Sequence, residues 1–277
     1  MEPTAAELRT MPFEPGHFRL SKAPLAMVLA QFTLQRAVSS QSLGQLRESL
    51  RSNGLERLTK KRERSVSFTP ASINPVLRDS EAWILLDSKS TKGVSVADKA
   101  ISCFTSDYTS FSEFSAYLGS IATSLSSCGS SFEATTVALR YVNVFDVGDD
   151  PTTVVTKSLG GLNRTGIGKE HHHHNYEFWC DTDYGRLTLR FSTTHGDRKP
   201  AQLGHAEVAF PTVFLKSYDD LVGHLDICAN TKTLSQPANW AGTATILEGM
   251  NLSIEQAFLN AINEDSLVSK FEAKAKQ

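Results

Sequence analysis

Apolar residues along this chain follow two different periods, and the first is typical of β-strands. Apolar positions alternate with polar ones, or form short continuous runs rich in β-branched and aromatic residues. These segments are 25–34, 83–87, 93–96, 101–105, 136–147, 176–180, 186–193, 207–215 and 221–228. The tripeptide Asp183-Tyr184-Gly185 separates two of them and predicts a hairpin turn.

The second period is helical and occurs three times. Ser42 is the expected N-cap of the first helix, and Asn53-Gly54 is expected to end it. The third helix is expected to begin near Met250. The apolar faces are Leu43, Leu46 and Leu50; then Phe111, Phe114, Leu118, Ile121 and Leu125; then Leu252, Ile254, Ala257, Phe258, Ala261 and Ile262, extended by Leu267, Val268 and Phe271.

The order of these elements predicts an α+β fold. We expect two sheet-plus-helix halves, with mainly antiparallel sheets each covered by a helix. Residues 1–20 form a polar N-terminal arm, 21–147 an N-terminal α+β half, and 176–277 a C-terminal β-rich half closed by an amphipathic helix. Glycines, aspartates and a histidine run between the halves indicate a linker or long loop over 148–175. The pattern leaves open whether the halves form one domain or two.

Composition narrows the class of protein. The 277 residues are 40% hydrophobic, enough for a sizeable core, and the formal charge of −2 excludes whole-surface attraction to nucleic acid or anionic lipid. The apolar run 24–30 is too short for a membrane span and follows no basic segment, so we expect a soluble, cytoplasmic protein without membrane contact. Cys103, Cys128, Cys180 and Cys228 form no short-range pair and are expected to be buried as small apolar residues.

Several motifs occur in a recognisable order. They are Ala23-Pro24-Leu25-Ala26-Met27-Val28 running to Phe32, the central Leu139-Arg140-Tyr141-Val142-Asn143-Val144-Phe145-Asp146, then Leu225-Asp226-Ile227 and the closing helix. Together they resemble a sporadically distributed bacterial protein family of unknown function. The resemblance implies a two-part α+β body and a bacterial or phage-like origin. It implies no activity, so no catalytic residue is carried over from it.

Arg140 is the first candidate binding residue. Alternation along its strand puts Arg140 and Asp146 on one face but about 20 Å apart, too far to pair. Two interpretations stay open. Arg140 is buried and paired with a carboxylate such as Asp226, or its planar guanidinium binds a phosphate or carboxylate in a groove.

The densest positive charge lies in the segment 57–64. Its side chains suit phosphate contact, but charges of this kind also protect the edge strand of a sheet from pairing. Only Phe68 is near enough to stack on a base, which weakens the case for nucleic acid. The basic residues are Arg57, Lys60, Lys61, Arg62 and Arg64.

Four consecutive histidines are the third candidate. Imidazole binds zinc, nickel and copper, but a built metal site needs ligands that converge from separate elements. We weigh a solvated loop against a metal site and a low-pH switch. The residues are His171, His172, His173 and His174.

No phosphate-binding loop, dinucleotide fingerprint or nucleophile elbow occurs in the sequence. We therefore expect no catalytic residue and no cofactor. The leading hypothesis is a non-enzymatic binding protein of a bacterial defence or toxin-neutralising locus, whose protein partner is encoded by a neighbouring gene. The alternatives are a nucleic-acid-binding protein that uses residues 57–64 and a metal-dependent hydrolase that uses the histidines. The oligomeric state stays open.

Overall fold

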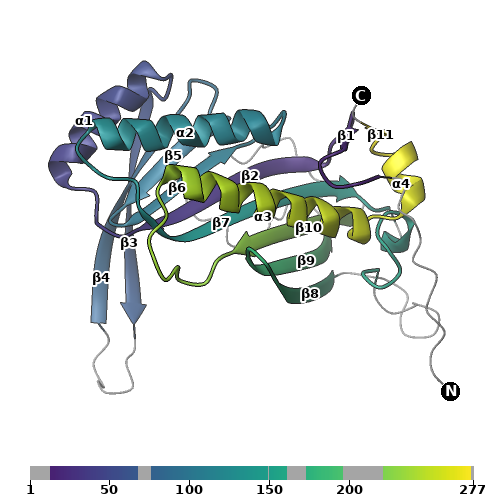
Figure 1. The fold of residues 1–277 in the computed structure, drawn as a ribbon. Helices are drawn as coiled ribbons and strands as arrows, with labels where there is room; N and C mark the ends of the chain where they lie inside the picture. The colour runs from purple at the N-terminus through teal and green to yellow at the C-terminus, as the bar shows by residue number, and fades with distance from the viewer. Residues whose placement is uncertain (1–12, 68–75, 149, 161–172, 196–220, 276–277) are drawn as a thin grey trace.

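The computed structural model describes residues 13–67, 76–148, 150–160, 173–195 and 221–275. Nine of the described strands form one antiparallel sheet (Figure 1). They are β2 (Leu25–Leu34), β3 (Arg57–Ser67), β4 (Val76–Leu86), β5 (Lys92–Ala97), β6 (Ala100–Thr105), β7 (Ala134–Asp146), β8 (His173–Thr182), β9 (Gly185–His195) and β10 (Leu221–Asn230). Their order across the sheet is β3-β4-β5-β6-β2-β7-β10-β9-β8.

The α+β class is confirmed, but the two halves share one sheet because β2 pairs directly with β7. The register runs from Leu25 opposite Asn143 to Leu34 opposite Ala134. Both strands carry buried apolar side chains on both faces, as Val28 and Leu29 do on β2. A strand that is apolar on both faces is stable only in the interior of a sheet that is covered on both sides. The two strands therefore lie side by side at its centre.

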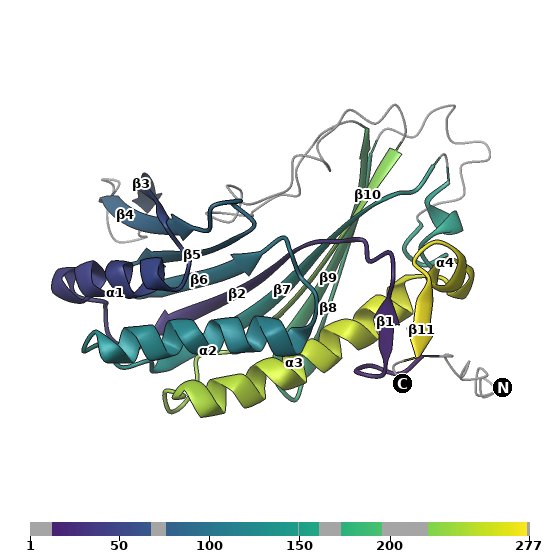
Figure 2. The same ribbon diagram turned by 90° about the horizontal axis from the view of Figure 1, so that it is seen from above.

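The long helices lie on one face of this sheet, as Figure 2 shows for α1 (Ser40–Ser52), α2 (Phe111–Ser127) and α3 (Trp240–Ala261). The predicted stripe of α2 is buried, and its N-cap Ser110 accepts a hydrogen bond from the backbone N–H of Glu113 at 3.2 Å. The predicted cap of α1 was wrong by three residues, because Ser39 accepts the bond from the N–H of Ser42. No helix in the described ranges is both long and apolar enough to span a bilayer.

The third helix differs most from its prediction, since α3 begins at Trp240 and not near Met250. Asn239 caps it by accepting a hydrogen bond from the N–H of Gly242 at 3.0 Å. The first turns contain glycine and threonine, which have low helix propensity, so the sequence pattern missed them. Packing stabilises them, because Thr243 is fully buried. Leu252 is 47% exposed and lies off the apolar face assigned to it.

Segments at both ends of the chain are held against the sheet. Phe18–Leu20 forms β1, which pairs with β11 (Ala273–Ala275), so the end of the predicted N-terminal arm is a strand. Residues 150–160 pack against the end of α3, where the N–H of Thr156 donates to the carbonyl of Ala261 at 2.8 Å. A short helix, α4 (Glu264–Ser269), follows α3. The strand predicted at 207–215 lies outside the described residues.

Apolar side chains form a core on each face of the sheet. The larger cluster lies between the sheet and the helices and includes Leu139, Leu225 and Leu247. Alternation along the strands puts the second cluster on the opposite face. Its members are Ala26, Met27, Leu29, Ile84, Leu86, Phe104, Val142, Val144 and Val222.

We expect Leu225→Ala to lower the free energy of unfolding by about 2–5 kcal/mol, because it leaves a cavity in the larger cluster. Urea denaturation followed by circular dichroism measures this change. Leu252→Ala is the matched control, since Leu252 is 47% exposed while Leu225 is 0% exposed. The control should change the free energy by no more than about 0.5 kcal/mol. Equal losses would contradict the assignment of β10 to the centre of the core.

Candidate functional site

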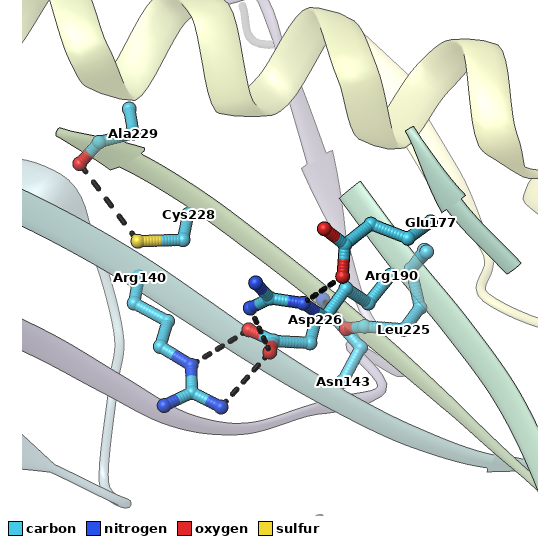
Figure 3. A network of polar contacts seen from close by, with 8 residues as sticks. All are labelled: Arg140, Asn143, Glu177, Arg190, Leu225, Asp226, Cys228 and Ala229. Atoms are coloured by element: carbon cyan, nitrogen blue, oxygen red, sulfur yellow. Dashed lines mark hydrogen bonds and ion pairs between the residues drawn. The ribbon is translucent and has the colours of Figure 1, made fainter. Parts of the chain in front are cut away.

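Four charged side chains form a row across neighbouring strands (Figure 3). Asp226 on β10 accepts hydrogen bonds from Nε and Nη2 of Arg140 on β7, at 2.7 and 2.8 Å. On the other side of Asp226, Arg190 on β9 places Nη1 3.8 Å away and donates from Nε to Glu177 on β8 at 2.7 Å. The predicted pairing of Arg140 with Asp226 is confirmed. The row lies on the face away from the helices, because Leu225 and Ile227 point toward them.

Burial changes along the row. The side chains of Arg140 and Asp226 are 11% and 9% exposed, whereas those of Arg190 and Glu177 are 39% and 50% exposed. The hydrogen bond to Glu177 is the main cause that raises the pKa of Arg190. The inner pair therefore stabilises the sheet interior, and the outer pair faces solvent. Asp226 occupies two N–H groups of Arg140, and a phosphate-binding role for Arg140 stays a prediction.

Cys228 lies beside this row but lacks the properties of a nucleophile. Burial is the main cause that raises its pKa to about 11, and Asp226 raises it further. Its thiol is thus protonated near neutral pH, and the thiolate is the reactive form. All four cysteines are free; Cys103 and Cys128 are buried, as predicted, whereas Cys180 and Cys228 are only partly so.

His224 is the one histidine whose side chain the structure places in the interior. It is 5% exposed, and its Nε2 lies 3.3 Å from Oγ1 of Thr194. Its Nδ1 has no hydrogen-bond partner in the part of the chain that the structure describes. Burial lowers the pKa of His224 to about 4, so the ring is neutral in the folded protein.

The basic segment forms β3, an edge strand of the sheet. Lys60 pairs with Glu81 at 3.1 Å and lies 4.2 Å from the ring centre of Trp83, and Arg57 donates to Ser90. Alternation places Arg57 and Lys61 on one face and Lys60, Arg62 and Arg64 on the other. The charges are therefore divided between two faces. The side chains of Arg62 and Arg64 lie outside the description, and phosphate contact stays a prediction.

The histidine run is only partly described. His171 and His172 lie outside the described residues, while His173 and His174 begin β8. The loop expected for these last two was wrong, because their backbones pair with Thr194 and Thr193 of β9. Among described residues, no three His, Cys, Asp or Glu side chains gather as metal ligands do. A metal-binding role for the run stays a prediction.

The other edge of the sheet, formed by β8, is the feature that the sequence did not indicate. Among the described strands only β9 pairs with β8. Its side chains Phe178 and Trp179 are 47% and 56% exposed and point to opposite faces. On the face away from the helices, the guanidinium of Arg186 lies 4.4 Å from the ring centre of Trp179. Large aromatic side chains thus flank an open strand edge.

A groove of about 400 Å³ lies on the helix-facing side of this edge. Its floor is formed by β8 and β9, and its walls by α3 and residues 156–159. None of the residues that line it carries a charge at neutral pH. They are Thr156, Ser158, Leu159, Tyr176, Phe178, Cys180, Thr182, Leu187, Leu189, Ser253, Gln256, Ala257, Asn260 and Ala261.

Comparisons of the chain with protein-family models, with curated proteins and with solved structures found no significant match. The family resemblance of the sequence motifs therefore stays a prediction. The only sequence signal for the groove is the run Tyr176-Glu177-Phe178-Trp179, in which alternation breaks at Trp179. That break indicates apolar side chains on both faces but does not show that the strand lies at an edge.

We expect Arg140→Ala to lower the free energy of unfolding by about 3–5 kcal/mol, since it leaves the Asp226 carboxylate buried without this partner. Glu177→Gln is the control in the same row and should cost less than about 1 kcal/mol, because its pair is exposed. Chemical denaturation at neutral pH measures both changes. Similar losses in the two variants would show that burial does not distinguish the inner pair from the outer one.

His224 predicts a loss of stability in acid. The unfolded chain binds a proton near pH 6.5, whereas the folded chain binds it only near pH 4. The free energy of unfolding should therefore fall as the pH drops through this window, by on the order of 3 kcal/mol from this residue. Denaturation at a series of pH values, compared with His224→Leu, isolates the effect. Parallel pH profiles for the two proteins would exclude it.

Proposed function

We propose that this chain is a non-enzymatic binding module that binds a protein partner at the β8 edge. The observation that carries the proposal is the pair of exposed aromatic residues, Phe178 and Trp179, on an open edge beside an uncharged groove. Exposed aromatic side chains of this kind are enriched where proteins bind partners. The partner expected from the sequence is the product of a neighbouring gene.

The contrast between the two edges supports this choice of surface. Unpaired strand edges cause aggregation, and natural sheets protect them with charged residues. The β3 edge has such protection, for Lys60 and Lys61 are exposed there. At the same distance from its hairpin partner, β8 presents Phe178 and Trp179 instead. An edge without charge protection that also borders a groove is better suited to binding than to repulsion.

The groove adds shape to the surface. Phe178 lies at its rim, and the backbone of β8 forms its outer floor. A volume of about 400 Å³ accommodates one or two large apolar side chains of a partner. Anchoring side chains in such pockets carry most of the binding free energy at protein interfaces.

Co-expression with the products of the adjacent genes tests the proposal. A partner that is retained by the natural chain should be lost from Phe178→Asp, with affinity reduced about tenfold or more, because a carboxylate at the rim of the groove is desolvated on binding. Val268→Asp is the matched control, since Val268 is 55% exposed on α4, away from the groove. It should retain the partner.

Two results would contradict the proposal. If no adjacent gene product is retained, the chain is not a binding module for them. If Phe178→Asp and Val268→Asp retain the partner equally, the β8 edge is not the binding surface.

A further inference from the structure

The two halves of the sheet repeat one arrangement about the central pair of strands. Outward from this pair the first half is ordered β2-β6-β5-β4-β3, and the second is ordered β7-β10-β9-β8. Each half also ends in a long helix on the same face, α2 after β6 and α3 after β10. In this correspondence β8 is the counterpart of β4, and α3 is the counterpart of α2.

Two elements of the first half have no counterpart among the described elements of the second. β3 covers the outer edge of β4 from Arg57 to Ser67. Helix α1 packs beside the C-terminal half of α2, where Oγ of Ser49 donates to Oγ of Ser124 at 3.0 Å. The corresponding places in the second half are the outer edge of β8 and the groove beside Ser253 to Ala261 of α3. The first half thus shows which element fits the β8 edge, and it is an antiparallel strand.

Charge indicates which residues that strand carries on one face. In the row of Figure 3 the sign alternates from strand to strand, positive at Arg140, negative at Asp226, positive at Arg190 and negative at Glu177. The row ends at the sheet edge with Glu177, whose side chain is 50% exposed. A lysine or arginine on the next strand would continue the alternation, because opposite charges on neighbouring strands stabilise their pairing. The same side chain would reach Trp179, as Lys60 of β3 reaches Trp83 of β4.

The groove indicates what the other face carries. Side chains of a strand paired with β8 alternate between the face of Glu177 and the face of Phe178. Those on the face of Phe178 enter the groove, whose lining is uncharged. Apolar residues fit there, while a charged one would lose its hydration without gaining a partner.

We infer that the β8 edge is extended by a strand of a partner protein in which basic residues alternate with apolar ones. The basic residues face Glu177 and Trp179, and the apolar residues fill the groove. This inference rests on the proposed function, because it names the kind of segment that the binding surface accepts. Main-chain hydrogen bonds to β8 supply affinity, and the alternating side chains supply selectivity.

Synthetic peptides of about ten residues, the usual length of a long strand, test the inference. The probe alternates lysine with valine, and a second peptide has glutamate in place of lysine. A third keeps the lysines but carries N-methyl groups on alternate residues, which removes the hydrogen bonds of one edge. Amide NMR titration of the full chain should show shifts in β8 with the first peptide and binding at least about fivefold weaker with the other two.

Variants of the chain locate the binding. Phe178→Asp should weaken the lysine peptide about tenfold, whereas Val268→Asp should not change it. Glu177→Gln should reduce the difference between the lysine and glutamate peptides without abolishing binding of either. Hydrogen exchange of the free chain supplies a further check, because the β8 amides that point away from β9 should exchange rapidly.

Each other outcome overturns the inference. Equal binding of lysine and glutamate peptides removes the charge argument, and equal binding of the N-methyl peptide removes strand addition. Slow exchange of the outward amides in the free monomer means that the chain covers its own edge, and a dimer abolished by Phe178→Asp means that a second copy does. If the peptides fail but a co-purified partner still depends on Phe178, the inference fails and the proposed function stands. If neither depends on Phe178, both fail.

Discussion

The antiparallel pairing of β2 with β7 is the constraint on which the rest of the structure depends. Both strands are buried on both faces, so neither is stable at an edge or beside solvent. Their pairing joins the two halves into one sheet of nine strands and places the remaining strands outward from the centre in sequence. It also places α2 and α3 side by side on one face (Figure 2). A single hydrophobic core over both halves follows from this.

A single open sheet has two edges, and this protein treats them differently. β3 carries exposed lysines at one edge, and β8 carries exposed aromatic residues at the other. The groove lies beside β8 because the described part of the second half has no α-helix in the position that α1 occupies in the first. Beneath this edge, the buried pair of Arg140 and Asp226 fixes the spacing of β7 and β10, and Arg190 and Glu177 extend the charge pattern to solvent. The second half thus combines a rigid interior with an open border.

Predictions from the sequence succeeded where local pattern and burial agree. β2 spans Leu25–Leu34 as predicted, because its apolar residues are dense enough to demand burial. The stripe of α2 and its cap at Ser110 are also as expected. The prediction failed at Trp240, where tertiary packing stabilises a turn of weak helix formers, and at Leu252, which points to solvent. Local propensity is a weak determinant wherever packing is strong.

The sequence by itself determined the α+β class, most of the strands, and the need of Arg140 for a carboxylate, since a buried guanidinium requires one. Only the tertiary structure decided that Asp226 meets Arg190 as well, that β3 and β8 are the edges, and that a groove opens beside Phe178. These properties depend on which strands become neighbours. Alternation along a strand specifies which face a side chain occupies, but it contains no information about what lies on either side of the strand.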